Sequence, residues 1–178
     1  VGEIKMENHI LDVNIQSFRG IENLELQNLN QINILTGDNN SGKTSILEVI
    51  QSFQNPADIR EWRMLVRRNT LGRTSPDITY YEGFYDLFNI NDDEKKIEYS
   101  ILLDNGEQKQ ISMSAKESLE EILEKDYDAM RGFFSAAGDG QQDDNIRTVP
   151  KLNINILVDG KQVCEHDIYD GQTILVRH

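Results

Sequence analysis

The sequence predicts an α/β fold in which a mixed sheet with antiparallel hairpins packs against a few helices. Three observations predict this fold. Apolar and polar residues alternate along residues 10–18, "ILDVNIQSF", as in a half-buried strand. Apolar residues then recur at i, i+3, i+4 and i+7 across residues 46–53, which is the stripe of a helix that faces a sheet. Two later segments, 96–114 and 151–168, each place two alternating arms around a turn that contains glycine, as hairpins do.

The N-terminal half is expected to hold three strands and two helices. After the first strand, residues 23–29 alternate again, and "QINILTG", residues 31–37, predicts a third strand. The helix across 46–53 should end at Asn55-Pro56, because the residue before proline disfavours the helical conformation. Residues 57–68 indicate a second helix. The aromatic segment 80–88, "YYEGFYDLF", has no pattern that assigns it to a helix or a strand.

The C-terminal half is expected to be two hairpins with a helix between them. The first hairpin turns at Asp104-Asn105-Gly106 and the second at Asp159-Gly160. Residues 115–134 predict an acidic helix, and residues 135–145, rich in glycine and aspartate, predict a loop. The apolar face of that helix would consist of Leu119, Ile122, Leu123, Met130 and Phe133.

Composition narrows the class of protein. The chain has 178 residues, enough for a single domain with a core. A net charge of −13 argues against a mainly electrostatic grip on nucleic acid by the domain as a whole. The single Cys164 excludes an internal disulfide, and the sequence has neither a signal-peptide pattern nor an apolar run of about 18 residues. We therefore expect a cytoplasmic protein with no membrane partner, in which residues 1–5 and 178 come from a vector.

Residues 37–44, "GDNNSGKT", fit the pattern G-x-x-x-x-G-K-[ST] at every fixed position. The glycines let backbone N–H groups approach phosphate oxygens, and a helix N-terminus adds unpaired N–H groups and a positive dipole end. The motif therefore predicts an ATP site, with a lysine ammonium at the β- and γ-phosphates and a threonine hydroxyl as a ligand of Mg²⁺. Ser45 either bonds the α-phosphate or caps the helix. The candidate nucleotide-binding residues are Gly37, Asn39, Asn40, Ser41, Gly42, Lys43, Thr44 and Ser45, with Thr44 as the metal ligand.

The order of segments around this motif adds a family resemblance. A strand, Phe18-Arg19-Gly20, a second strand and then "INILTGDNNSGKTSILEVI" resemble the N-terminal segment of ABC-class ATPase heads. The most similar groups are the SMC, RecF and OLD families and their "AAA family ATPase" relatives, and the resemblance covers about residues 9–53.

The resemblance implies a P-loop NTPase fold, specifically an ABC-ATPase-like N-terminal lobe. It implies an ATP-dependent homodimer that controls a nucleic-acid-directed process, such as DNA repair or phage defence, with a nuclease or DNA as partner. It also implies that Arg19 contacts the nucleotide phosphates. From charge and position alone, Arg19 could equally be a surface residue at a strand end.

The second motif of such heads, an apolar run that ends in Asp-Glu, is not found in the sequence. Asp104 and Asp159 follow apolar runs, but both are expected in hairpin turns. Ser135 begins a segment that only superficially resembles the serine-glycine signature of these heads. Catalytic residues thus stay unassigned, and the chain is expected to be an N-terminal fragment of a longer ATPase, slow or inactive alone. The alternative is a non-hydrolysing NTP-binding or protein-interaction module.

Other chemistry-bearing residues have structural explanations. Trp62 is expected to pack in the core. Cys164 and His166 share a strand face, but the sequence does not favour a catalytic thiol there. The basic residues of the acidic chain concentrate in one region, where they form either a solvated face paired with carboxylates or a contact for DNA or an acidic partner. These are Arg60, Arg63, Arg67, Arg68 and Arg73.

Overall fold

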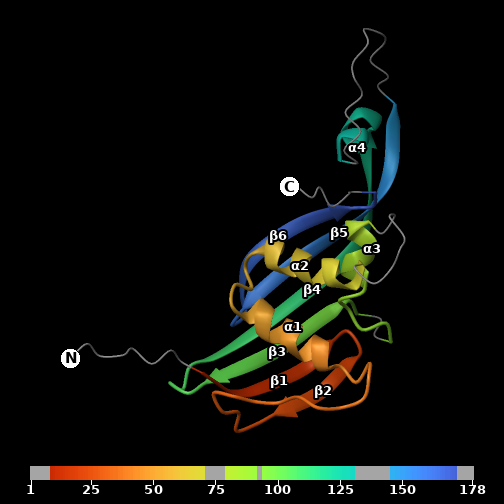
Figure 1. The fold of residues 1–178 in the computed structure, drawn as a ribbon. Helices are drawn as coiled ribbons and strands as arrows, with labels where there is room; N and C mark the ends of the chain where they lie inside the picture. Colours follow the sequence, from red (N-terminus) through yellow and green to blue (C-terminus); the bar gives the residue numbers. More distant parts are fainter. Residues whose placement is uncertain (1–8, 71–78, 92–93, 131–144, 172–178) are drawn as a thin grey trace, which may run out of the picture.

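The computed structural model describes residues 9–70, 79–91, 94–130 and 145–171, which form one six-stranded sheet and four helices (Figure 1). The sheet has the strand order β2-β1-β3-β4-β5-β6. The strands are β1 (Ile10–Phe18), β2 (Ile21–Leu26), β3 (Lys96–Leu103), β4 (Gln108–Leu123), β5 (Ile146–Val158) and β6 (Lys161–Tyr169). The helices are α1 (Lys43–Phe53), α2 (Ile59–Thr70), α3 (Tyr80–Tyr85) and α4 (Glu124–Met130).

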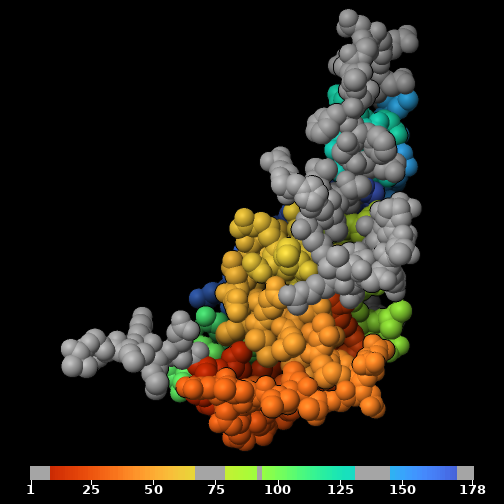
Figure 2. Space-filling view, in the orientation of Figure 1, coloured from red at the N-terminus to blue at the C-terminus, as the bar shows by residue number. Residues whose placement is uncertain are grey.

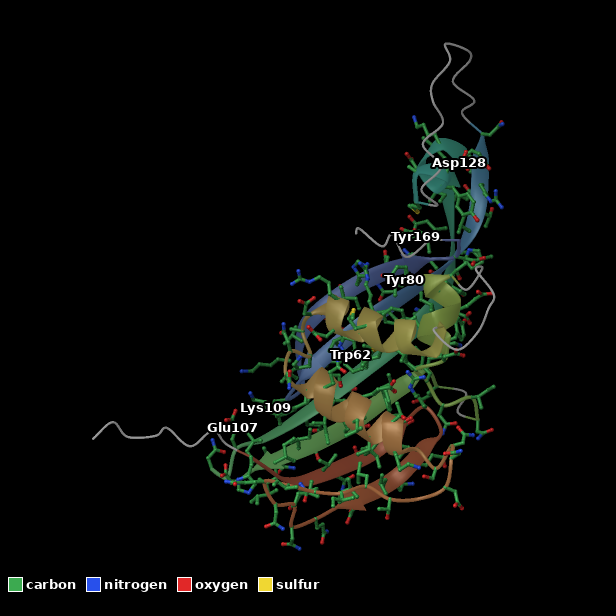
Figure 3. All side chains as sticks on the ribbon, in the orientation of Figure 1. Trp62, Tyr80, Glu107, Lys109, Asp128 and Tyr169 are labelled. Atoms are coloured by element: carbon green, nitrogen blue, oxygen red, sulfur yellow. The ribbon has the colours of Figure 1, made fainter. Side chains whose placement is uncertain are left out.

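Helices α1, α2 and α3 lie across one face of the sheet, and α4 lies on the end of β4 and β5 that extends beyond it (Figure 1). Alternate strand residues such as Val13 and Ile15 point under the helices and are buried. Trp62 of α2, labelled in Figure 3, is also fully buried, and its Nε1–H donates to the Pro56 carbonyl at 2.9 Å. The expected packing role of Trp62 is therefore confirmed.

Helix α1 is fixed to the sheet by a buried polar contact. The Ser52 hydroxyl lies 2.8 Å from the Tyr99 hydroxyl of β3, and it also bonds the Val49 carbonyl at 2.9 Å. Burial raises the pKa of Tyr99, so this phenol stays protonated and able to donate a hydrogen bond. The contact sets the position of α1, whose first residues carry the phosphate-binding motif.

Loss of the Ser52 hydroxyl should therefore lower the free energy of unfolding. We expect Ser52→Ala to cost about 1–3 kcal/mol, because it leaves the buried Tyr99 hydroxyl without this partner. Denaturant unfolding measures the change. The double variant Ser52→Ala/Tyr99→Phe should recover part of the loss, and equal stability of parent and Ser52→Ala would contradict the assignment.

Helix α3 crosses α2 at a glycine. A Cβ on Gly83 would overlap with the Cγ1 atom of Val66, so only glycine allows this close approach. Thr79 caps α3, since its side chain accepts from the Glu82 N–H while the Glu82 carboxylate accepts from the Thr79 N–H. After α3, the chain reaches the turn between β1 and β2, where the Leu87 carbonyl accepts from the Arg19 N–H at 3.0 Å.

Most expected elements are present. The strand at 10–18, the strand in 23–29, the helix over 46–53, the helix over 57–68 and both hairpins are confirmed, and the unassigned segment 80–88 begins with α3. In the second turn, Asp159 and Gly160 have φ angles of 50° and 74°, the left-handed conformation that such a turn requires. The part of the chain that the structure describes holds no helix with the length and apolar character that a membrane crossing requires.

The acidic helix expected over residues 115–134 is wrong for residues 115–123. Strand β4 continues to Leu123 and pairs with β5 along its whole second half, and of the described residues in this range only 124–130 are helical. Leu119 and Leu123 are four residues apart, a spacing that places them on one face of either a helix or a strand. Leu119 is 71% exposed, so no helical apolar face is buried there. Phe133 and residues 135–144 of the loop expected at 135–145 lie outside the described residues.

The strand expected at residues 31–37 is also wrong. The segment has no strand conformation, and Ile32 and Ile34 are 85% and 84% exposed. Alternation predicts an apolar face but not a hydrogen-bonding partner, and no described strand pairs with this segment. All pairings among the described strands are antiparallel, so the parallel component implied by a mixed sheet is not found in this part of the chain.

Candidate nucleotide site

The motif at residues 37–44 forms a tight loop at the start of α1. Gly42 is the N-cap residue of α1 with a φ of 84°, and Asn40 has a φ of 68°. Gly37 has a φ of 151°, and a Cβ on it would come within 2.9 Å of the Ser41 hydroxyl. The loop thus needs glycine at both fixed positions, because a side chain would be strained at these positive φ angles and, at Gly37, would also crowd the Ser41 side chain.

Lys43 holds this loop together. Its ammonium donates to the Gly37 carbonyl at 2.8 Å, the Asp38 carbonyl at 2.5 Å and the Ser41 hydroxyl at 3.1 Å. The first helical hydrogen bond at this end runs from the Ile46 N–H to the Gly42 carbonyl at 3.0 Å, and Gly42 has no side chain to cap the helix. The N–H groups of residues 43–45 precede that bond, so they can donate to a ligand at the helix start.

An open cleft of about 750 Å³ lies beside the loop, between the start of α1 and the turn that joins β1 and β2. It brings most of the predicted residues together with Arg19, although Arg19 is about 20 residues earlier in the chain. The cleft is lined by Arg19, Gly20, Ile21, Asn40, Ser41, Gly42, Thr44, Ser45 and Glu48. Asn39 and Lys43 line an adjoining hollow formed by residues 39–45, and Gly37 reaches the site through its bond to Lys43.

This donor set fits a polyphosphate. The loop supplies a lysine ammonium, the N–H groups of a helix start and three hydroxyl side chains, those of Ser41, Thr44 and Ser45. The Thr44 side chain is exposed in the cleft, where its hydroxyl is accessible to a hydrated Mg²⁺ ion. The residues present therefore fit a magnesium-bound nucleotide phosphate.

Arg19 forms a buried ion pair with Glu48 of α1. The Arg19 Nε and Glu48 Oε2 atoms are 2.9 Å apart, and the two side chains are 12% and 2% exposed. Burial lowers the pKa of the Arg19 guanidinium, while the negative charge of Glu48 opposes that shift. Arg19 is thus not an exposed strand-end residue; it is a largely but not fully buried cation at the wall of the cleft.

Arg19 also joins the cleft to the helices behind it. Its backbone N–H donates to the Leu87 carbonyl at 3.0 Å, and its guanidinium approaches the Asp86 and Leu65 carbonyls at 3.4 Å. Its φ of 53° lies in the left-handed region, which lets the turn bring both backbone and side chain inward. One residue therefore connects the β1–β2 turn with α1, α2 and the end of α3.

Sequence reasoning missed Glu48. A signal for it exists, because Thr44, Glu48 and Ser52 recur every four residues and so share one face of α1. Thr44 lines the cleft, whereas Glu48 and Ser52 are buried next to the apolar stripe. A buried carboxylate at such a position predicts a cationic partner, which the structure identifies as Arg19.

The other candidate residues do not join the site. The Asp104 carboxylate lies 2.7 Å from the His9 ring nitrogen, and that of Asp159 accepts from the Gln110 N–H at 2.8 Å. Both residues lie in hairpin turns, between β3 and β4 and between β5 and β6, as expected. Burial raises the pKa of Cys164, the opposite of what a reactive thiolate needs, and burial lowers the pKa of His166. Ser135 lies outside the described residues.

The arginine region has local partners where it is described. Arg60 bonds the Asp58 carboxylate and lowers the pKa of Asp58 to about 2. Arg63 lies over the Tyr80 ring, 4.9 Å from its centre, and contacts His166 at 3.1 Å. The prediction that these arginines pair with nearby carboxylates is thus confirmed for Arg60. The side chains of Arg67 and Arg68, and all of Arg73, lie outside the described part of the chain.

Comparison with known proteins agrees with the geometry of the loop. Residues 9–166 match the family model of the AAA ATPase domain. The chain is also 36% identical over 98 residues to the uncharacterized protein MJECL10 of Methanocaldococcus jannaschii; that match covers 51% of this chain and 40% of the relative's length. No solved structure matches the chain significantly. Because the family match covers most of the sequence, the chain belongs to the AAA ATPase domain family, whose members bind and use ATP.

Proposed function

We propose that this chain binds ATP with Mg²⁺ through the loop at residues 37–44 and the start of α1. The observation that carries the proposal is the position of the Lys43 ammonium, which is held by three oxygen atoms of the loop at the start of a helix that has no side-chain cap. Phosphate oxygens are stronger acceptors than backbone carbonyls, so a bound polyphosphate would compete for this ammonium.

Each residue of the loop has a separate task in this proposal. The N–H groups at the start of α1 and the Lys43 ammonium bind the β- and γ-phosphates, and the Ser45 hydroxyl bonds the α-phosphate. The Thr44 hydroxyl holds Mg²⁺, which supplies the charge that neutralises the phosphates when it is bound. Asn39 and Asn40 contribute their backbone N–H groups. Arg19 adds a cation from the opposite wall of the cleft.

We further propose that the complete protein is an ATPase of the SMC, RecF and OLD-like group, which dimerises on binding ATP and controls a nucleic-acid-directed process such as DNA repair or phage defence. Support comes from the order of elements, β1, Arg19-Gly20, β2 and then the loop and α1, which is the order on which the resemblance rests. A nuclease or DNA would be its partner, and the cytoplasm its compartment. These parts of the proposal rest on resemblance.

Hydrolysis by this chain alone is expected to be slow. Glu48 brings a carboxylate to the lining of the cleft, but this carboxylate already forms an ion pair with Arg19. Phosphoryl transfer needs groups that neutralise charge and orient a water molecule in addition to a phosphate cradle. We propose that the complete ATPase supplies these groups from other segments.

Calorimetric titration tests the proposed nucleotide site. The chain is titrated with a non-hydrolysable ATP analogue in the presence of Mg²⁺, and again with the metal removed by EDTA. We expect saturable binding with one analogue per chain, weakened on removal of Mg²⁺, because the metal offsets part of the phosphate charge. No binding under either condition would contradict the proposal.

Sedimentation velocity tests the proposed dimer separately. The chain should sediment as a monomer without nucleotide and shift towards a dimer when Mg²⁺ and the analogue are added at saturating concentration. A monomer at all analogue concentrations, together with confirmed nucleotide binding, would reject dimerisation by this chain and leave the nucleotide site intact.

A further inference from the structure

A second hollow, of about 470 Å³, adjoins the cleft that is proposed to bind phosphates. Arg19 and Gly20, in the turn between β1 and β2, line both, so the two hollows meet at this turn. In Figure 2, yellow-green atoms of the segment near residue 90 lie beside the orange atoms of the loop region. The second hollow is lined, besides Arg19 and Gly20, by Tyr85, Asp86, Phe88, Asn89, Ile90, Asn91 and Lys95.

The two hollows differ in chemistry. The phosphate cleft exposes mostly polar atoms, whereas the second hollow exposes mostly apolar ones. Its apolar walls come from Tyr85, Phe88 and Ile90, and Asn91 places an exposed side-chain amide at its edge. Apolar walls with a few polar groups are typical of a site for a flat organic group such as a nucleobase. A polar cleft that continues into an apolar hollow matches the two ends of a nucleotide.

The wall of the second hollow is preformed. The Phe88 N–H donates to the Tyr85 carbonyl at 3.1 Å, and the Asn91 N–H donates to the Asn89 side-chain oxygen at 2.9 Å. The Asn89 side-chain amide bonds the Glu22 carboxylate of β2. The backbone bond from Arg19 to Leu87 ties the same segment to the β1–β2 turn. A ligand would therefore find this wall already in place and would lose little free energy in ordering it.

Ile90 is the residue at which this hollow can be tested. Its side chain is 96% exposed and so contributes little to the folded core, while Phe88 and Asn89 beside it are each 5% exposed. A ligand in the hollow would cover part of Ile90 and remove that apolar surface from water. Asn91 is exposed as well, so substitutions at both positions should leave the fold intact.

We propose that the second hollow receives the base and sugar of the nucleotide whose phosphates lie in the cleft beside Arg19. This assignment rests on the proposed function, because it extends the same ligand from the loop at residues 37–44. It gives residues 85–91 a binding role that no motif in the sequence indicates.

The test compares two probes that share phosphates and differ in the base and sugar. The chain and the variants Ile90→Ser and Asn91→Ala are titrated, with Mg²⁺, with the non-hydrolysable ATP analogue and with inorganic tripolyphosphate. We expect each variant to bind the analogue about fivefold more weakly, since it loses part of one apolar or amide contact, and to bind tripolyphosphate like the parent. Ile146→Ser is the matched control, because Ile146 is also exposed, at 65%, but lies on β5 away from the cleft.

Four results would overturn the assignment, and they are distinguishable. If the variants bind both probes as the parent does, or lose both equally, the base lies elsewhere while the phosphate site stands. If Ile146→Ser weakens the analogue as much as Ile90→Ser does, the effect is not local to the hollow. If the parent binds neither probe, the proposed function fails together with this inference.

Discussion

Replacing Lys43 with alanine should weaken binding of the magnesium-bound ATP analogue on the order of 100-fold. The Lys43 ammonium is the strongest hydrogen-bond donor in the loop, and it supplies the positive charge of residues 37–44. Removing it takes away charge-assisted hydrogen bonds to phosphate oxygens that backbone N–H groups cannot replace. Calorimetric titration of the variant beside the parent measures the loss.

The fold should survive this substitution. Lys43 makes its three hydrogen bonds within an exposed loop, so its removal should change the free energy of unfolding by less than about 1 kcal/mol. Lys161→Ala, at the exposed lysine that begins β6, is the matched control and should bind the analogue like the parent. An unchanged affinity in Lys43→Ala would contradict the assignment of the loop as the phosphate site.

Replacing Glu48 with alanine should lower the free energy of unfolding by about 3 kcal/mol. The carboxylate side chain is 2% exposed and pairs with an arginine that is itself 12% exposed. Its removal leaves the largely buried Arg19 guanidinium without its ion-pair partner, and losing the partner of a largely buried charge costs more than losing a surface contact. Denaturant unfolding of the parent and the variant measures the difference.

Two further variants test whether the loss of stability in Glu48→Ala comes from the buried pair rather than from the loss of any glutamate. Glu107 forms an exposed ion pair with Lys109 in the β3–β4 hairpin (Figure 3), and Glu107→Ala should cost less than about 1 kcal/mol. The double variant Arg19→Met/Glu48→Leu should be more stable than Glu48→Ala, because it removes both charges and keeps the volume filled. A cost for Glu48→Ala no larger than that for Glu107→Ala would contradict a buried ion pair.

The sequence predicted the elements whose signals are local. The hairpin turns need particular residues at particular φ angles, such as Asp159 and Gly160, and those residues are visible in the sequence. The loop at residues 37–44 is similarly specified by its own glycines and lysine. Helix α1 was predictable because its apolar stripe is longer than one turn.

The sequence could not predict features that depend on a distant partner. Alternation in residues 31–37 resembles that of β1, but β1 has neighbours on both sides and residues 31–37 pair with no described strand. Residues 115–123 carry a spacing that fits both a helix and a strand, and pairing with β5 decides between them. The Arg19–Glu48 pair and the hollow at residues 85–91 likewise arise only when separate segments meet.

The central claim is that the loop at residues 37–44, the β1–β2 turn and the segment after α3 form one nucleotide site. Amide chemical shifts of the isotope-labelled chain, recorded by NMR with Mg²⁺ while the ATP analogue is added, test it most directly. The largest changes should fall on residues 37–45, on Arg19 and Gly20, and on residues 85–91. Shifts confined to other parts of the sheet, or no shifts at saturating analogue, would contradict the claim.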